Sequence, residues 1–179
     1  VDWSRPKCVR LTSMPAKTLI GMIASGELDC VIIARPTNSF REKHPDVVRL
    51  FPDFESVERR YYEDTRVYPI MHVIAMRKAV LEGRPWVARN LYNAFEESRR
   101  RSLERILDQA VSRYPVPWLT AYITRMQQMF DGDPFPYGIE PNRPTLELFL
   151  RYAHEQGIAH SLVQPEDIFP AGIMASVKI

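Results

Sequence analysis

The sequence predicts an α/β chain, with buried parallel strands in its first half and helices in its second half. Two apolar runs, residues 29–34 and 70–76, have the composition of strands buried on both faces of a parallel sheet. Only His72 interrupts the second run. Beyond residue 85 the apolar residues recur at steps of three and four, which is the spacing of helices.

Length and composition allow a core of ordinary size. The chain has 179 residues, of which 45% are apolar, so one or two domains are expected. Its 24 basic and 22 acidic residues leave a net charge of +2, which indicates neither a nucleic-acid nor a membrane partner. Cys8 and Cys30 lack metal-binding spacing and are interpreted as small buried thiols. No apolar segment approaches the ~20 residues of a membrane helix, and no signal-peptide pattern is present, so a cytoplasmic protein is expected.

The first half should alternate strands with a helix. Residues 8–14 alternate as a short strand does, Pro15 marks a helix start, and Gly26 is placed to end that helix. Residues 47–51 are a third strand candidate, whereas 54–64 permit no firm assignment.

Residues 65–69 would lead into the 70–76 strand, because Pro69 has no amide hydrogen for a strand ladder. Arg66, Tyr68 and His72 would then lie near a strand start, where two lobes would meet over a ligand.

The second half should contain three helices. Pro85 opens a long one, residues 118–130 form the next, and Pro144 begins the third, which Gly157 stops. The basic run 99–101 on the long helix is expected to be a solvated face. Its partners would be Glu96, Glu97 and Glu104.

Nucleotide-binding, esterase and zinc-protease motifs are absent from the sequence. The candidate functional residues are therefore polar side chains in apolar or loop contexts: Arg35, His72, Tyr137, Glu140, Asn142, Arg143 and His154. Arg35 directly follows the 29–34 strand, where open α/β sheets bind ligands, and is placed to meet an anion.

Several of these residues also have a structural interpretation. His72 would serve as a hydrogen-bonded core histidine, and Asn142 as a helix N-cap. Arg143 would pair with Glu147 along the helix, and His154 would be an exposed residue stabilised by the helix dipole.

Five segments closely resemble the 4,5-dihydroxyphthalate decarboxylase family. They are IASGELDCVIIARP (23–36), VRLFPD (48–53), YPIMHVIAMRK (68–78), PWVARNLYNAFEE (85–97) and PYGIEPNRPTLELFLRYAHEQG (136–157). The resemblance implies a periplasmic-binding-protein-like (type II) two-lobed fold, present here as its C-terminal half, since family members are considerably longer. Residues 1–64 would be the remainder of the second lobe, and 65–179 the crossing strand and C-terminal helical part of the first. Such a half would expose sheet edges and apolar faces, so the chain is expected either to be marginally stable or to associate, for example into a homo-oligomer.

The resemblance also implies a carboxy-lyase of aromatic catabolism and phthalate degradation. In 4,5-dihydroxyphthalate each carboxylate lies para to a ring hydroxyl, which raises carbanion character at the carbon that bears it. Protonating that carbon expels carbon dioxide and gives protocatechuate, so no redox cofactor is needed.

For this reaction His72 is the expected proton donor, and Arg35 and Arg143 the bidentate ligands of the carboxylates. Glu140 would take the phenolic proton or, as a lesser alternative, hold a divalent metal with His72. The other substrate-binding residues would be Tyr137 and Asn142. The competing hypothesis is a solute-binding module of the nitrate, sulfonate and taurine type, which binds a small organic anion without chemistry.

Overall fold

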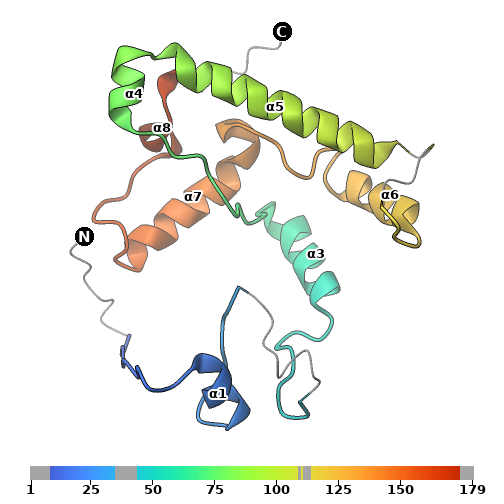
Figure 1. Cartoon of the computed structure of the whole chain (residues 1–179), viewed down its shortest axis with the longest axis vertical. Helices are drawn as coiled ribbons and strands as arrows, with labels where there is room; N and C mark the ends of the chain where they lie inside the picture. The colour runs from blue at the N-terminus through green and yellow to red at the C-terminus, as the bar shows by residue number, and fades with distance from the viewer. Residues whose placement is uncertain (1–8, 35–43, 109, 111–113, 174–179) are drawn as a thin grey trace. The chain divides into compact units, whose positions relative to one another are not determined.

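The computed structural model describes residues 9–34, 44–108, 110 and 114–173 (Figure 1). The chain divides into two compact units, an N-terminal unit of Arg5–Arg60 and a C-terminal unit that contains Tyr61–Ile179. The two lobes predicted for residues 1–64 and 65–179 stay a prediction.

The α/β prediction, and with it the periplasmic-binding-protein-like sheet, is wrong. The described residues contain helices, turns and extended chain but no strand. Residues 70–76 are extended, yet no backbone hydrogen bond joins them to another described segment. Residues 29–34 likewise form no strand pairing with another described segment, and the predicted strand 47–51 is also irregular. Of the predicted strand 8–14, residue 8 lies outside the described residues and 9–14 form no strand.

The physical reason is that a strand needs a neighbour. An apolar run is stable as a buried strand only when other strands pair with its backbone and other layers cover its faces. Here Ile32 is 96% exposed and Met71 is 79% exposed, so neither run has such cover among the described residues. Cys30 is exposed as well, which corrects its interpretation as a buried thiol; Cys8 lies outside the described residues.

One helix of the N-terminal unit, α1 (Leu19–Ala24), begins later than Pro15. Thr18 is its N-cap, and the Thr18 hydroxyl oxygen accepts a 3.1 Å hydrogen bond from the Gly21 amide. Gly26 follows the helix with a φ of +75°, the left-handed conformation that glycine adopts most easily, so the predicted helix end is confirmed.

Helix α3 (Phe54–Thr65) occupies the segment that the sequence left unassigned. Arg66 ends it with a φ of 57°, and the Arg66 amide donates to the Tyr62 carbonyl at 2.7 Å. Beyond it, the Tyr68 ring packs edge-on to Phe130, with centroids 5.0 Å apart. The Tyr68 amide donates a 3.1 Å hydrogen bond to the Thr145 hydroxyl of α7. The chain after α3 is therefore fixed to α7 at Tyr68.

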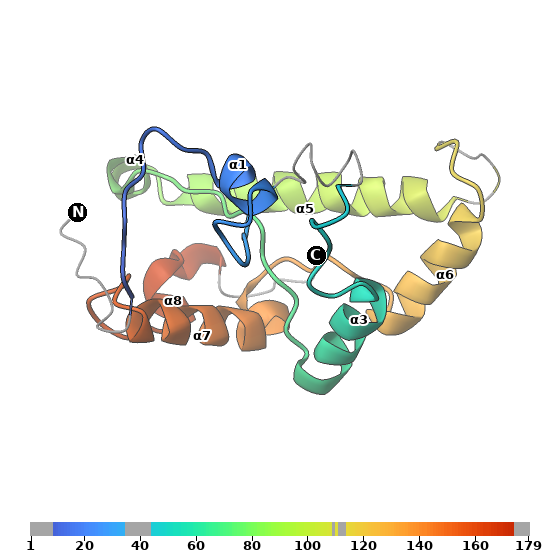
Figure 2. The same cartoon turned by 90° about the horizontal axis from the view of Figure 1, so that it is seen from below.

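The C-terminal unit is built on the long helix α5 (Trp86–Leu107), which the sequence predicted from Pro85. Helices α4 (Lys78–Gly83) and α6 (Leu119–Met129) contact α5, and so does the 3₁₀ turn η1 (Ala171–Ile173). Helix α8 (Pro165–Ile168) packs on α7 (Ile139–Glu155), as Figure 2 shows.

Helix α7 begins five residues before the predicted start at Pro144. Pro141 lies in the first turn, where amide hydrogens have no helical partner to lose, whereas Pro144 lies inside the helix and leaves one carbonyl of the first turn without its helical donor. The predicted stop is confirmed, since Gln156 caps the helix and Gly157 has a φ of 71°.

Only a few side chains of the C-terminal unit form a buried core. The described buried apolar residues are Pro134, Ile123, Ile139, Leu146, Leu150 and Pro165. None of the described helices is long and apolar enough to cross a membrane.

The basic run on α5 is a solvated face at Arg100 and Arg101, as predicted. Arg100 donates to Glu97 and Glu104, and Arg101 donates to Glu97. Hydrogen bonds from Arg100 and then Arg101 lower the pKa of the Glu97 carboxyl to about 2.

Arg99 differs from its two neighbours. Its side chain is only 16% exposed, and it donates to Glu96 on α5 and, at 2.7 Å, to Asp133 in the loop after α6. Arg99 therefore ties this loop to α5.

We expect Arg99→Gln to lower the free energy of unfolding by roughly 1–3 kcal/mol, because two carboxylates lose a charged partner that is largely shielded from water. Urea unfolding followed by circular dichroism measures this change. Arg101→Gln is the matched control and should cost about 0.5 kcal/mol or less, since its ion pair is exposed. If Arg99→Gln and Arg101→Gln lowered the free energy of unfolding equally, Arg99 would not be the residue that ties the loop to α5.

Candidate functional site

The start of α7 brings together four of the predicted site residues. Tyr137 lies in the loop before the helix, and Glu140, Asn142 and Arg143 lie in its first turns. Their proximity follows from their nearness in sequence, but the hydrogen bonds around them depend on the fold.

Gly138 and Asn142 shape the entry to the helix. Gly138 has a φ of 103° and a ψ of 166°, a backbone conformation essentially reserved for glycine. The Asn142 side-chain amide donates to the Pro136 carbonyl at 2.7 Å and to the Gly138 carbonyl at 2.9 Å. Asn142 lies within the helix, and not at its N-cap, and its amide holds the loop that carries Tyr137.

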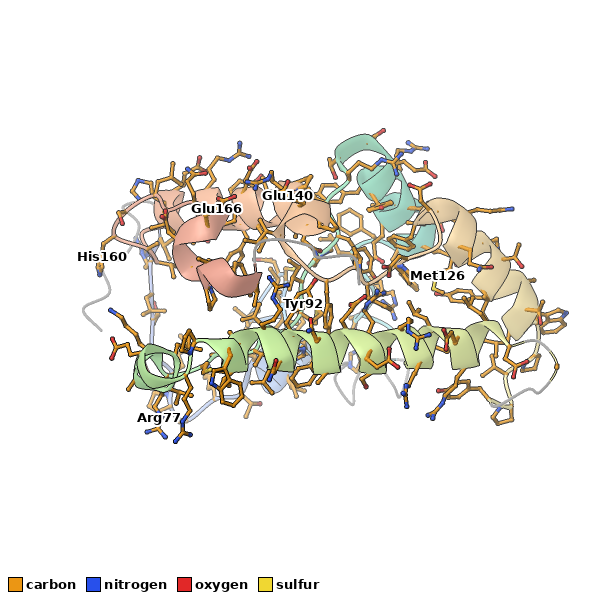
Figure 3. All side chains as sticks on the ribbon, turned by 90° about the horizontal axis from the view of Figure 1, so that it is seen from above. Arg77, Tyr92, Met126, Glu140, His160 and Glu166 are labelled. Atoms are coloured by element: carbon orange, nitrogen blue, oxygen red, sulfur yellow. The ribbon has the colours of Figure 1, made fainter. Side chains whose placement is uncertain are left out.

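Arg143 is surrounded by three glutamates. Its guanidinium donates to Glu140 at 2.5 Å, to Glu147 at 3.3 Å and to Glu166 of α8 at 2.5 Å. The pairing with Glu147 was the structural interpretation of Arg143, and Glu166 adds a link between α7 and α8. Figure 3 shows Glu140 and Glu166 on these two helices.

These bonds determine the charge of the site. Hydrogen bonds from Arg143 lower the pKa of the Glu140 and Glu166 carboxyls, and the same bonds raise the pKa of Arg143. The Arg143 guanidinium therefore faces the ionised Glu140 and Glu166 carboxylates near neutral pH, and it also donates to Glu147. An anionic ligand would bind Arg143 by replacing at least one glutamate.

The other predicted residues lie elsewhere. His72 is exposed in the extended chain between α3 and α4, and no interaction in the described part of the chain joins it to the start of α7. The His154 Nδ1 atom lies 3.4 Å from the Ala159 carbonyl oxygen, beyond the end of α7. Arg35 lies outside the described residues. Within those residues, no group of three His, Cys, Asp or Glu side chains is arranged to hold a metal ion.

Helix α5 contributes two residues that sequence reasoning did not select. The Tyr92 ring lies 6.2 Å from that of Tyr137, and a Cβ atom at Gly138 would lie 3.4 Å from the Tyr92 hydroxyl oxygen. Burial is the main cause that raises the pKa of Tyr92. The Arg99 guanidinium lies 5.7 Å from the centre of the Tyr137 ring, within cation–π range. Tyr92 projects from α5 toward this loop in Figure 3.

Only part of this arrangement has a signal in the sequence. The helical spacing of Glu96 and Arg99 predicts their ion pair, but nothing local distinguishes Arg99 from Arg100 as the residue that reaches Asp133. The four residues on α5 and the loop, Tyr92, Arg99, Asp133 and Tyr137, thus form a support for the start of α7.

We expect Gly138→Ala to lower the free energy of unfolding by about 1–2 kcal/mol, because alanine is strained at a φ of 103°. Thermal unfolding gives the difference. Gly83→Ala at the end of α4 is the control, since a Cβ there meets nothing within 4 Å. It should be neutral or slightly stabilising. If Gly138→Ala were equally harmless, the loop conformation would not require glycine.

The Arg143 cluster should make stability depend on pH. The folded-state pKa values of Glu140 and Glu166 lie below the ordinary value of 4.5, so their contribution is fully present above pH 4.5. It is lost as the pH falls through the lowered folded-state values, because both carboxylates become protonated.

The measurement is the thermal midpoint of the wild type and of Arg143→Gln from pH 7 to about pH 2. The wild type should be the more stable protein at pH 7, and this advantage should shrink as the pH falls below 4.5. Arg125→Gln, at an exposed position on α6, is the control and should show no such change. A difference in thermal midpoint between the wild type and Arg143→Gln that stays constant with pH would contradict the proposed role of Glu140 and Glu166.

No family model matches the chain. The chain is similar to a protein of Comamonas testosteroni named 4,5-dihydroxyphthalate decarboxylase, with 30% identity over 175 residues. The similarity covers 97% of this chain and 53% of that protein. The chain therefore spans about half the length of the curated relative that it matches.

Proposed function

We propose that this protein decarboxylates an aromatic dicarboxylate such as 4,5-dihydroxyphthalate without oxidation. The observation that carries the proposal is the 30% identity to a protein of that name, which extends over 97% of the chain. Similarity over nearly the whole chain includes both the α3–α4 connection with His72 and the start of α7.

The reaction requires one proton and one departing molecule of carbon dioxide. The para hydroxyl of the substrate donates electron density to the carbon that bears the carboxylate, and this carbon takes up a proton. The bond to the carboxylate then breaks, its electron pair returns to the ring, and carbon dioxide leaves. The product from 4,5-dihydroxyphthalate is protocatechuate.

The protein has to hold a dianion and deliver the proton. Arg35 and Arg143 are the proposed carboxylate ligands, since a planar guanidinium makes two parallel hydrogen bonds. The Arg143 side chain is 31% exposed, so a substrate carboxylate can reach it and replace Glu140 or Glu166 as its partner.

Glu140, once released from Arg143, would take the phenolic proton of the substrate. Tyr137 and Asn142 complete the proposed binding residues. The Asn142 amide fixes the backbone on which Tyr137 stands, so substitution of Asn142 should disturb binding through the loop. His72 is the proposed proton donor, because imidazole is suited to proton transfer near neutral pH.

The test incubates the purified protein with 4,5-dihydroxyphthalate and follows protocatechuate by chromatography. We expect His72→Asn to lower turnover by ~10²- to 10⁴-fold, the usual contribution of general-acid catalysis. His160→Asn is the matched control, because His160 is also exposed and lies outside the proposed site. It should keep wild-type turnover.

Substrate binding by the wild type without any product would contradict decarboxylation and favour the anion-binding module. Product formation that survives His72→Asn would instead leave the reaction in place and exclude His72 as the donor. Glu140 and His154 would then be the next residues to substitute.

A further inference from the structure

A groove runs beside the middle of α7, away from the loop that carries Tyr137. It has a volume of about 600 Å³ and is lined by residues from three segments of the C-terminal unit. These are the end of α3 together with Val67, the face of α7 from Pro144 to Tyr152, and residues 162–164. Pockets for small ligands usually measure about 300–1,000 Å³, so the groove is of a suitable size.

Two contacts hold the walls of the groove in place. The hydrogen bond from the Tyr68 amide to the Thr145 hydroxyl fixes the chain after α3 against α7. On the other side, the packing of α8 on α7 positions residues 162–164, which directly precede α8. The Arg143–Glu166 ion pair strengthens that second contact.

The lining is mainly apolar and aromatic. Tyr61, Leu148, Tyr152 and Leu162 present side chains that are partly exposed to solvent in the groove. Tyrosine rings provide flat contact area at a low cost in conformational entropy. A ring or short hydrocarbon chain therefore fits this surface better than a sugar or a peptide backbone does.

Two charged side chains also line the groove, one helical turn apart. The Glu147 carboxylate accepts a hydrogen bond from Arg143 at 3.3 Å, but Arg143 also donates to Glu140 and Glu166, so the charge of Glu147 is only partly compensated. Arg151 has a weaker partner, since its Nε atom lies 3.8 Å from the Glu155 carboxylate, beyond hydrogen-bond distance. The guanidinium of Arg151 therefore retains donors for an anion.

We propose that this groove binds a small monocarboxylate with an apolar ring. The carboxylate accepts hydrogen bonds from Arg151, and the ring packs against the tyrosine and leucine side chains. Arg151 is not among the residues proposed for decarboxylation, and binding in the groove does not require that activity. A ligand of this size on a partly open surface should bind with a dissociation constant of roughly 1 mM.

The test is a titration of the isotope-labelled chain with 3-phenylpropionate, followed by amide chemical shifts. We expect shifts at residues 61–67, 144–152 and 162–164. Two further ligands test the two parts of the interaction separately. Propionate has the carboxylate without the ring, and 3-phenylpropanol has the ring without the charge. Each should bind at least ~10-fold more weakly than 3-phenylpropionate.

Arg151→Gln should weaken 3-phenylpropionate binding by about tenfold or more, whereas Arg125→Gln on α6 should leave it unchanged. Arg151 is exposed, so its substitution should not unfold the chain, and circular dichroism verifies this. Unchanged affinity in Arg151→Gln, shifts centred on Tyr137 and Asn142, or no saturable shifts would each overturn the proposal.

Discussion

The ion pair between Arg99 and Asp133 is the contact on which the arrangement of the C-terminal unit most depends. It joins the long helix α5 to a loop 34 residues further along the chain, and that loop leads directly into α7. The same guanidinium lies near the ring of Tyr137, whose neighbour Gly138 opens α7. Few apolar side chains are buried in this unit, so a shielded ion pair has more influence here than it would in a protein with a large core. The ion pair holds the loop, and the loop leads into the first turns of α7. Helix α8 in turn packs on α7.

Local signals in the sequence predicted α5 and α6 and the ends of α1 and α7, whereas α4 was not predicted and the α3 segment was left unassigned. The start of α5 after Pro85 and the end of α7 before Gly157 depend on the backbone preferences of those residues alone. The start of α7 was missed, because it depends on the conformation of Gly138 and on hydrogen bonds from Asn142 to the preceding loop. The strand predictions failed because a strand depends on contacts with distant segments, which local signals do not report. Apolar content shows that a segment prefers to be buried, but pairing with another segment decides whether it forms a sheet.

The candidate site shows the same division between local and distant contacts. Spacing along a helix predicted that Arg143 would pair with Glu147, and that pair is present. Spacing could not show Glu166, which lies 23 residues away on α8. It also could not show that Tyr92 of α5 lies against Gly138. In this structure Arg143 links α7 to α8 through Glu166. In the proposed reaction the same guanidinium N–H groups would bind a substrate carboxylate, so the two roles compete. Exchange between these partners would couple ligand binding to the contact between α7 and α8.

The hydrogen bond from Tyr68 to Thr145 has a consequence for how the chain meets proteases. Before this bond the chain is helical, and after it residues 69–76 run extended without a backbone hydrogen bond to another described segment. Proteases bind their substrates as extended chain and cut most readily where no local structure has to unfold first. The stretch between Tyr68 and α4 meets both conditions, and its apolar side chains suit enzymes that cleave beside large hydrophobic residues. A single cut there would divide the chain into two pieces, and Tyr68 and Thr145 would still join them.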